Sequence, residues 1–291
     1  MKPLIFVYDV GSKNSGSTAM RIFQLSHIAE IAGIESKIVS NDIDFTGISD
    51  AILLFSKNCY TWAFEKQELI GKIRNRNIIC YDPLDNIFEN DTSSLFDFVL
   101  ASSITQYKNL SKYCSRVHPI LHHHDLLINS QEIKKSKTIG YFGETINMLK
   151  PKSQHLSSMI DIHHINTKDH RKNSDWRAET VKYDFHYTSR NWRLRDGYKP
   201  FTKGFNAAAS NSIVVLHRPK RGSEEALLLG HDYPFYIEQK TDLSSPEAVT
   251  DFLYQDDSRR KHAMDIMRYL KELSSPEAIS DQLLQLMAAA S

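Results

Sequence analysis

Short apolar runs alternate with segments of helical spacing, and this alternation constrains the fold more than any other feature of the sequence. Residues 4–8 (LIFVY) and 51–55 (AILLF) are continuous apolar runs, typical of strands buried on both faces of a parallel sheet. Between them, the apolar residues of 17–32 recur at helical spacing, and Gly33 stands where a helix would end. The pattern predicts an α/β fold with doubly wound parallel sheets, and not a sandwich or a helical bundle.

The alternation continues to the end of the chain and indicates two domains. Further strands are expected at residues 37–39, 77–81, 96–101, 138–143, 159–165, 183–188 and 212–216, and helices at 64–74, 104–114, 202–209, 224–229, 246–254, 261–273 and 276–287. A chain of 291 residues is at the length where a single core usually stops growing. The stretch 129–137 is polar and has no apolar period, so we place the boundary inside it and expect domains at 1–134 and 135–291.

The hexapeptide LSSPEA occurs twice, at 243–248 and 273–278. A serine that caps a helix, a proline in the first turn and a glutamate beside the positive helix end form a general start signal. We therefore interpret the two copies as two helix starts and not as an internal duplication.

Charge and cysteine content limit the partners and the compartment. The chain has 36 Lys and Arg against 35 Asp and Glu, so overall charge does not drive binding to a polyanion and no nucleic-acid partner is expected. No apolar run approaches the roughly 18 residues that span a bilayer, so no transmembrane segment is expected, and peripheral contact with a membrane is left open. The first apolar run is too short for a signal peptide, and the three cysteines form no close pair. A cytoplasmic protein is expected.

A loop rich in glycine and serine, GSKNSGS at residues 11–17, follows the first expected strand. It lies at the carboxyl end of that strand, where open α/β sheets bind ligands. Its glycines allow close backbone approach, and the next helix offers N–H donors. It contains neither a Walker loop nor a dinucleotide fingerprint. The candidates are Gly11, Ser15, Gly16 and Ser17, and both a ligand-contacting loop and an ordinary turn stay open.

The densest positive charge lies in residues 189–203, which contain five basic residues against one aspartate. Pro200 suits a first helical turn, which would place Lys199 and Lys203 one turn apart near a positive helix end. Together with Arg190 they would form a cradle for a diphosphate. A solvated basic face is the alternative.

The run His122-His123-His124-Asp125 contains residue types that bind zinc. Adjacent residues on an extended segment point to opposite faces, so three consecutive histidines do not converge on one ion. No metal or other cofactor is expected. A ligand-facing loop and a plain polar loop remain open. Asp82 and Asp85 follow another expected strand. They are either cap and turn residues or site residues that face the cleft, and both possibilities stay open.

Taken together, several stretches resemble the GT-B glycosyltransferases, which have two Rossmann-like domains facing a cleft. They are residues 11–21, 79–86 (ICYDPLDN), 119–125 (PILHHHD), 139–143 (IGYFG) and 198–207 (YKPFTKGFNA). The first is similar to the Ser/Gly-rich loop and arginine-bearing helix that open such enzymes. The last, with the strand at 212–215, is similar to their donor-domain "Lys-Pro-x-Thr-Lys" element.

The resemblance implies an enzyme that moves a sugar from a nucleotide-activated donor to a glycan or lipid-linked acceptor in surface polysaccharide synthesis. Residues 135–291 would be the donor domain. Arg190, Lys199 and Lys203 would stabilise charge on the leaving phosphate, and Glu225 would accept hydrogen bonds from the ribose.

Residues 1–134 would form the acceptor-side domain, with Gly16, Ser17 and His124 facing the donor sugar or acceptor. An inverting enzyme also needs a general base. The candidates are Asp9, Asp85 and His124. Inversion and retention are both left open, as are two rival functions: a non-catalytic glycan- or nucleotide-binding module, and a metalloenzyme built on His122 to Asp125.

Overall fold

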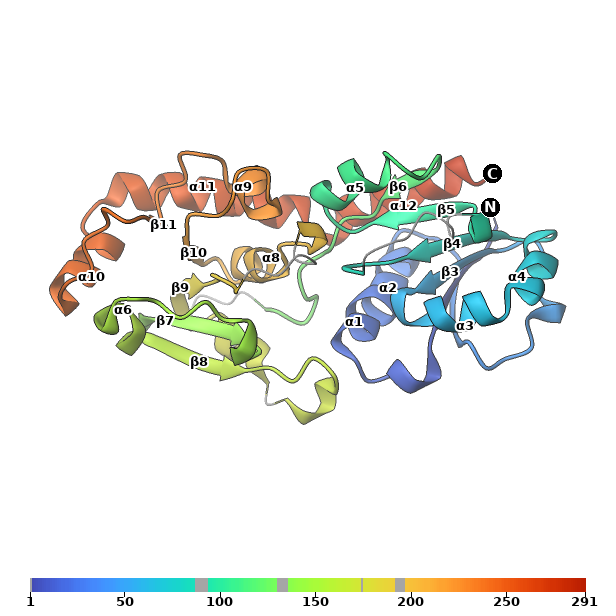
Figure 1. Cartoon of the computed structure of the whole chain (residues 1–291), viewed down its shortest axis with the longest axis horizontal. Coiled ribbons are helices and arrows are strands. Elements are labelled where there is room, and N and C mark those ends of the chain that lie inside the picture. The colour runs from blue at the N-terminus through green and yellow to red at the C-terminus, as the bar shows by residue number, and fades with distance from the viewer. Residues whose placement is uncertain (1, 87–93, 130–135, 174, 192–196) are drawn as a thin grey trace. The chain divides into compact units, whose positions relative to one another are not determined.

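A computed structural model describes residues 2–86, 94–129, 136–173, 175–191 and 197–291. The described chain forms two compact units (Figure 1). The first contains the described residues of 1–123, 194–200 and 275–291, and the second contains those of 124–193 and 201–274. The predicted boundary between residues 134 and 135 falls outside the described residues, and the C-terminal segment belongs to the first unit.

The first unit is built on a parallel sheet with the strand order β2-β1-β3-β4-β5-β6. Its strands are β1 (Leu4–Tyr8), β2 (Ser36–Ser40), β3 (Ile52–Ser56), β4 (Ile78–Asp82), β5 (Phe98–Ala101) and β6 (Val117–Pro119). Its helices are α1 (Gly16–Thr18), the π-helix η2 (Ala19–Gln24), α2 (Leu25–Ile31), α3 (Tyr60–Glu65), α4 (Gln67–Arg74), α5 (Ile104–Leu110) and α12 (Pro276–Ala289). Its 3₁₀ turns are η1 (Val10–Ser12), η3 (Phe45–Gly47) and η4 (Lys57–Cys59).

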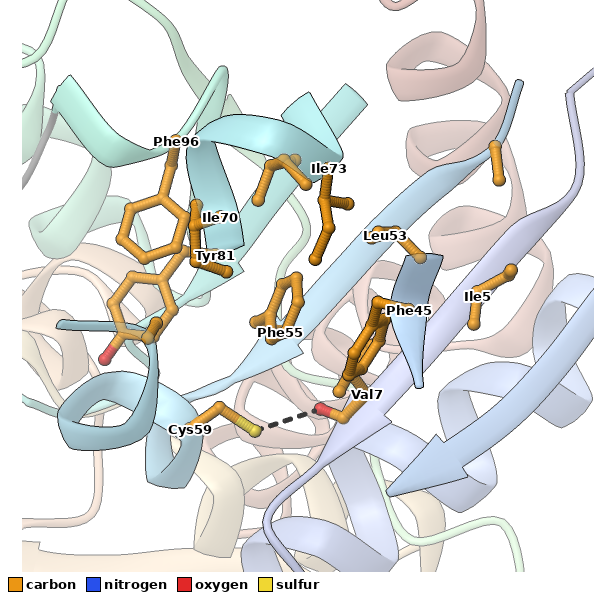
Figure 2. Packing of buried hydrophobic residues seen from close by; sticks show 13 residues of the cluster. Ile5, Val7, Phe45, Leu53, Phe55, Cys59, Ile70, Ile73, Tyr81 and Phe96 are labelled. Atoms are coloured by element: carbon orange, nitrogen blue, oxygen red, sulfur yellow. Dashed lines mark hydrogen bonds between the residues drawn. The ribbon is translucent and has the colours of Figure 1, made fainter. Parts of the chain in front are cut away.

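The apolar runs become strands because both of their faces are buried. Ile5, Val7, Leu53 and Phe55 point to one face of the sheet and pack with Tyr81 and with the apolar face of α4 (Figure 2). The alternate residues of β1 and β3 on the other face are also buried, except for the half-buried Tyr8 at the end of β1. Continuous hydrophobicity, without an alternation of polar residues, is what such a doubly covered strand requires.

The second unit is built on a parallel sheet with the order β11-β10-β9-β7-β8. Its strands are β7 (Ser136–Gly143), β8 (Ile160–His164), β9 (Tyr183–Tyr187), β10 (Ile213–His217) and β11 (Tyr236–Ile237). Its helices are α6 (Gln154–Ser158), α7 (Trp176–Thr180), α8 (Thr202–Ala209), α9 (Glu224–Leu229), α10 (Pro246–Tyr254) and α11 (Asp257–Leu273), with 3₁₀ turns η6 (Thr145–Asn147) and η7 (His170–Lys172). The predicted α/β class with parallel sheets is confirmed in both units.

Several expected elements agree closely with the structure. Helices α9 and α10 have the predicted bounds. Ser245 and Ser275 each accept a hydrogen bond from the backbone N–H three residues later, with a proline at the next position, so both LSSPEA copies are helix starts. They open helices of different units, α10 and α12. No helix of the described residues is both long enough and apolar enough to cross a membrane.

Other expectations are wrong. The helix expected at 64–74 is two helices, because the backbone leaves helical geometry at Lys66 (φ −109°, ψ 29°). Helix α8 has the bounds expected for it, but the expectation that Pro200 lies in its first turn is wrong, because Phe201 is the N-cap and the helix begins at Thr202. Lys203 therefore lies in the first turn of α8, whereas Lys199 precedes the helix. The sequence also did not predict β6, β11, α6 and α7.

Candidate functional site

Each sheet has a topological switch point. In the first unit the chain runs from β1 to β2 on one side and then to β3 on the other, and in the second unit it runs from β7 to β8 and then to β9. Ligands of open α/β sheets bind at the carboxyl ends of the strands at such points. The segments that follow β1, β3 and β4, and those that follow β7, β9 and β10, therefore hold the candidate residues.

The loop after β1 is held together by its own hydroxyl groups. Ser15 caps α1 by accepting a hydrogen bond from the Thr18 N–H at 3.2 Å, and its Oγ lies 3.0 Å from Ser17 Oγ. A Cβ at Gly11 would lie 3.2 Å from Asp9 Oδ2. Asn41 donates to the other carboxylate oxygen of Asp9 at 3.0 Å. The predicted loop residues thus lie together with Asp9 at the switch point of the first sheet.

The helical segment after this loop contributes to a buried ion pair. Arg21, on η2, donates from Nε to Asp82 Oδ2 at 2.6 Å, with side chains 2% and 1% exposed. The other guanidinium nitrogens donate to the carbonyls of Leu121 and Ile120, each at 3.0 Å. A π-helix is uncommon and often marks a functional position. From the sequence, Asp82 is expected as a cap, turn or site residue, but its pairing with Arg21 is not predicted, because no spacing rule links positions 61 residues apart.

The turn after β4 is strained and tightly fixed. Leu84 has φ +52°, a value that favours glycine. Its N–H donates to Asp82 Oδ1 at 2.9 Å, and its carbonyl accepts from Ser102 Oγ at 3.1 Å and from Gln106 Nε2. A non-glycine residue keeps such a conformation only where its surroundings enforce it. The next residue, Asp85, is held in a defined position as a result.

Asp85 is bracketed by two lysines of the same unit. Lys57 Nζ lies 2.8 Å from Asp85 Oδ1, and Lys199 Nζ lies 4.0 Å from Asp85 Oδ2. Burial raises the pKa of the Asp85 carboxyl, but Lys57 and then Lys199 lower it by more than burial raises it. The pKa therefore lies below its usual value. Lys57 was not predicted as a site residue; its place directly after a buried strand is the signal that could have identified it.

The histidine run spans the change from the first unit to the second. His122 and His123 are buried in the first unit, where their ring nitrogens bond to the carbonyls of His123 and Met20 at 2.8 and 2.9 Å. Burial, followed by the charge of His123 and Arg21, holds the pKa of His122 well below its usual value. The plain polar loop considered from the sequence is wrong for these two residues.

The end of the run belongs to the second unit. His124 Nδ1 lies 3.2 Å from Ser274 Oγ, and Asp125 accepts from Arg177 Nε at 2.8 Å. Among the described residues, no group of three His, Cys, Asp or Glu side chains could hold a metal ion.

The second unit brings three of the predicted donor residues together. Arg190, just after β9, pairs with Glu225 Oε1 at 2.7 Å, and their side chains are 17% and 8% exposed. Lys203 Nζ lies 3.8 Å from the centroid of the Tyr141 ring. Burial, then Glu144, raises the pKa of Tyr141 to about 12, and Arg190 opposes this shift. Both cations therefore act on the same ring.

Gly143, at the end of β7, makes room for Lys203. Its φ of +151° lies in the region that favours glycine, and a Cβ there would lie 3.0 Å from both Cε and Nζ of Lys203. The glycine predicted as a turn thus also permits a close approach of the lysine. Lys199 belongs to the first unit and is not part of this group. Arg193 and Arg195 lie outside the described residues.

A hydrogen-bonded group at the ends of β9 and β10 lies in the same unit. His217 Nδ1 is 3.1 Å from both Tyr187 Oη and Ser189 Oγ, and the His217 N–H donates to Ser189 Oγ at 2.7 Å. Burial, then Lys152, lowers the pKa of His217. This histidine was not predicted as a site residue, although it ends an apolar run at the carboxyl edge of a strand.

Comparisons with solved structures identify the fold. An alpha-glucosyltransferase in complex with UDP superposes with a TM-score of 0.60 at 11% identity, covering 98% of this chain and 100% of that chain. The glycotransferase of kitacinnamycin gives 0.51 at 8% identity, covering 98% and 99%. The GtfA/B complex gives 0.50 at 8% identity, and the chain spans only 57% of the matched chain. No protein-family model matches the chain, and no curated protein matches its sequence.

The first two likenesses cover 98% of the chain, and both units contain a parallel sheet with a switch point. The chain has the GT-B glycosyltransferase fold with two Rossmann-like domains, as the sequence resemblance predicted.

Proposed function

We propose that the chain is a glycosyltransferase that uses a nucleotide-activated sugar. The observation that carries the proposal is the arrangement of Lys203, Gly143 and Arg190 at the carboxyl ends of β7 and β9. Two cations at a strand edge, beside a glycine that lets one of them approach the backbone, suit the phosphates of a donor. The full-length likeness to an enzyme bound to UDP supports UDP as the nucleotide.

Each donor residue has a role in this proposal. Lys203 and Arg190 neutralise charge that develops on the leaving diphosphate. Glu225 orients Arg190 before the donor binds and accepts hydrogen bonds from the ribose. Lys199, predicted for the same task, lies beside Asp85 in the first unit.

In the transfer, an acceptor hydroxyl forms a bond to the anomeric carbon, the bond from that carbon to the diphosphate breaks, and the nucleoside diphosphate leaves. If the reaction inverts the anomeric centre, a base takes the hydroxyl proton. Asp9, Asp85 and His124 are the proposed candidates. Gly11, Ser15, Gly16 and Ser17 would contact the sugar or acceptor.

We further propose a glycan or lipid-linked acceptor, surface polysaccharide synthesis and a cytoplasmic location. The near-neutral charge of the chain supports a small or singly charged acceptor over a polyanion. One structural neighbour is an alpha-glucosyltransferase in complex with UDP and a 13-mer DNA, so DNA is the alternative acceptor to be tested.

Calorimetric titration with UDP tests the donor assignment. The wild-type protein should bind UDP, and Lys203→Gln should weaken binding by about 1.5–3 kcal/mol, the scale of a hydrogen bond to a charged group. Lys240→Gln is the matched control, since that lysine is 87% exposed and lies in the same unit. Slow hydrolysis of UDP-glucose would separate an enzyme from a binding module. Equal affinity for UDP in both variants would contradict the donor site.

A further inference from the structure

Three charged side chains meet at the carboxyl edge of the first sheet. Lys57, Asp85 and Lys199 come from three segments, and the carboxylate lies 2.8 Å from one ammonium group and 4.0 Å from the other. Their side chains are 21%, 26% and 30% exposed. This degree of burial leaves them accessible to a ligand and also reduces the screening of their charges by water.

The backbone of each segment is fixed by hydrogen bonds. The carbonyl of Lys57 accepts from Tyr81 Oη at 3.3 Å. Asp85 follows Leu84, whose strained conformation is held by three hydrogen bonds to side chains. The carbonyl of Tyr198, next to Lys199, accepts at 3.0 Å from the buried Ser103 Oγ, which caps α5. The three charges are thus presented by rigid segments, as a preorganised site requires.

We infer that Lys57 and Lys199 bind a phosphate group of the acceptor and that Asp85 positions the two ammonium groups. The inference rests on the proposed transferase function and names the class of its acceptor: a molecule that carries a single phosphate or a diphosphate near the accepting hydroxyl. The three groups together carry one positive charge. A phosphate has enough oxygens to accept from both ammonium groups at once.

The surroundings of the cluster favour an anion. Burial first, and then the charges of His123, Arg21 and Lys57, lower the pKa of His122, so the positive charge of Lys57 also acts on the interior at this edge of the sheet. The two lysines also keep the Asp85 carboxylate ionised. A carboxylate stabilised in this way is a weak proton acceptor, which fits a positioning role better than that of the general base.

A single phosphate fits better than a polyanion. Binding to a nucleic-acid backbone uses positive charge spread over an extended surface. Here the chain as a whole has a formal charge of +1. The cluster has two cations, one at each oxygen of a single carboxylate. A lipid-linked diphosphate or a phosphorylated sugar supplies the matching local charge.

The test titrates inorganic phosphate into protein saturated with UDP, so that the donor site is filled. Lys57→Gln and Lys199→Gln should each weaken phosphate binding about tenfold, and Lys57→Arg should restore it. Asp85→Asn should also weaken phosphate binding, because the two ammonium groups lose the carboxylate that positions them. Lys72→Gln, at an exposed lysine of α4, should have no effect. Melting temperatures verify that each variant is folded, and UDP affinity should be the same in Lys199→Gln as in wild type.

Opposite results overturn the inference. Unchanged phosphate binding in both lysine variants would make the cluster a structural ion network. Stronger binding in Asp85→Asn would make Asp85 a competitor of the phosphate and not a positioning group. Loss of UDP affinity in Lys199→Gln would return that lysine to the donor site. A DNA duplex that displaces phosphate at far lower concentration would replace the single phosphate by a polyanion. Failure of the wild-type protein to bind UDP would count against the donor function alone, since phosphate can be titrated without it.

Discussion

The two units carry ion pairs of very different burial at the same edge of their sheets. In the first unit, the Arg21–Asp82 pair is 2% and 1% exposed and also holds two backbone carbonyls. In the second, the Arg190–Glu225 pair is 17% and 8% exposed. A fully buried pair has no access to a ligand, so its role is structural. In a pair near the surface, the cation can exchange the carboxylate for a ligand. The burial of an ion pair therefore indicates its function better than its residue types do.

Replacing Arg21 should have the largest effect on stability. Arg21→Met leaves the Asp82 carboxylate buried without its charge partner, which costs about 3–5 kcal/mol. Denaturant unfolding measures the loss. The control is Arg74→Met, because the Arg74–Asp97 pair is 40% and 13% exposed and such pairs contribute about 0–1 kcal/mol.

The double variant Arg21→Met/Asp82→Asn sharpens this result. Asparagine removes the orphaned charge but keeps the Oδ1 acceptor for the Leu84 N–H. It should recover part of the stability lost in Arg21→Met. A single variant that loses less than about 1 kcal/mol would mean that the buried pair does not organise the first unit.

Replacing Arg190 should affect the ligand more than the fold. Arg190→Met removes one of the two cations proposed to bind the diphosphate and should weaken UDP binding by about 1.5–3 kcal/mol. Its loss of stability should be smaller than that of Arg21→Met, since the Glu225 carboxylate is closer to solvent. Calorimetry and unfolding on the same samples give both values. If Arg190→Met lowers the free energy of unfolding as much as Arg21→Met does, burial does not separate the roles of the two ion pairs.

The sequence predicted the architecture because strands buried on both faces and helix starts are local signals. The run 51–55 and the two LSSPEA segments are examples. Strand β11, with two residues, exists only through its pairing with β10, and no local pattern predicts it. The helix expected at 64–74 failed for a similar reason, since nothing in its composition indicates the break at Lys66.

The candidate site was predicted less completely. The density of basic residues pointed to Arg190 and Lys203, which the second unit does bring near Tyr141. Lys199 lies only four positions before Lys203, yet it belongs to the other unit, because the path of the backbone and not the spacing decides its neighbours. Arg21 and Asp82 are paired across 61 positions, which no motif encodes.

Gly143 offers a test of the close approach of Lys203. Gly143→Ala introduces a Cβ 3.0 Å from Lys203 Nζ at a φ of +151°, and should cost about 1–3 kcal/mol of stability through strain while also weakening UDP binding. Gly222→Ala is the control, because its φ is +82° and no atom lies within 4 Å of its added Cβ. The control should lose stability without losing UDP affinity. Equal UDP affinity in both variants would separate Gly143 from the donor site.

The smallest expected effect is a difference in pH dependence. Burial, with the charges of His123, Arg21 and Lys57, holds the pKa of His122 in the folded protein well below the usual 6.5. As the pH falls below 6.5, the unfolded chain therefore binds a proton that the folded chain does not, and stability falls by at most about 1.4 kcal/mol per pH unit. His122→Gln should flatten this decline between pH 6.5 and 5.5, measured by unfolding at each pH. His27→Gln, at an exposed position, is the control. Parallel declines in wild type and His122→Gln would mean that another group titrates, and the half-buried His217 of the second unit, whose pKa is also lowered, would be the next to replace.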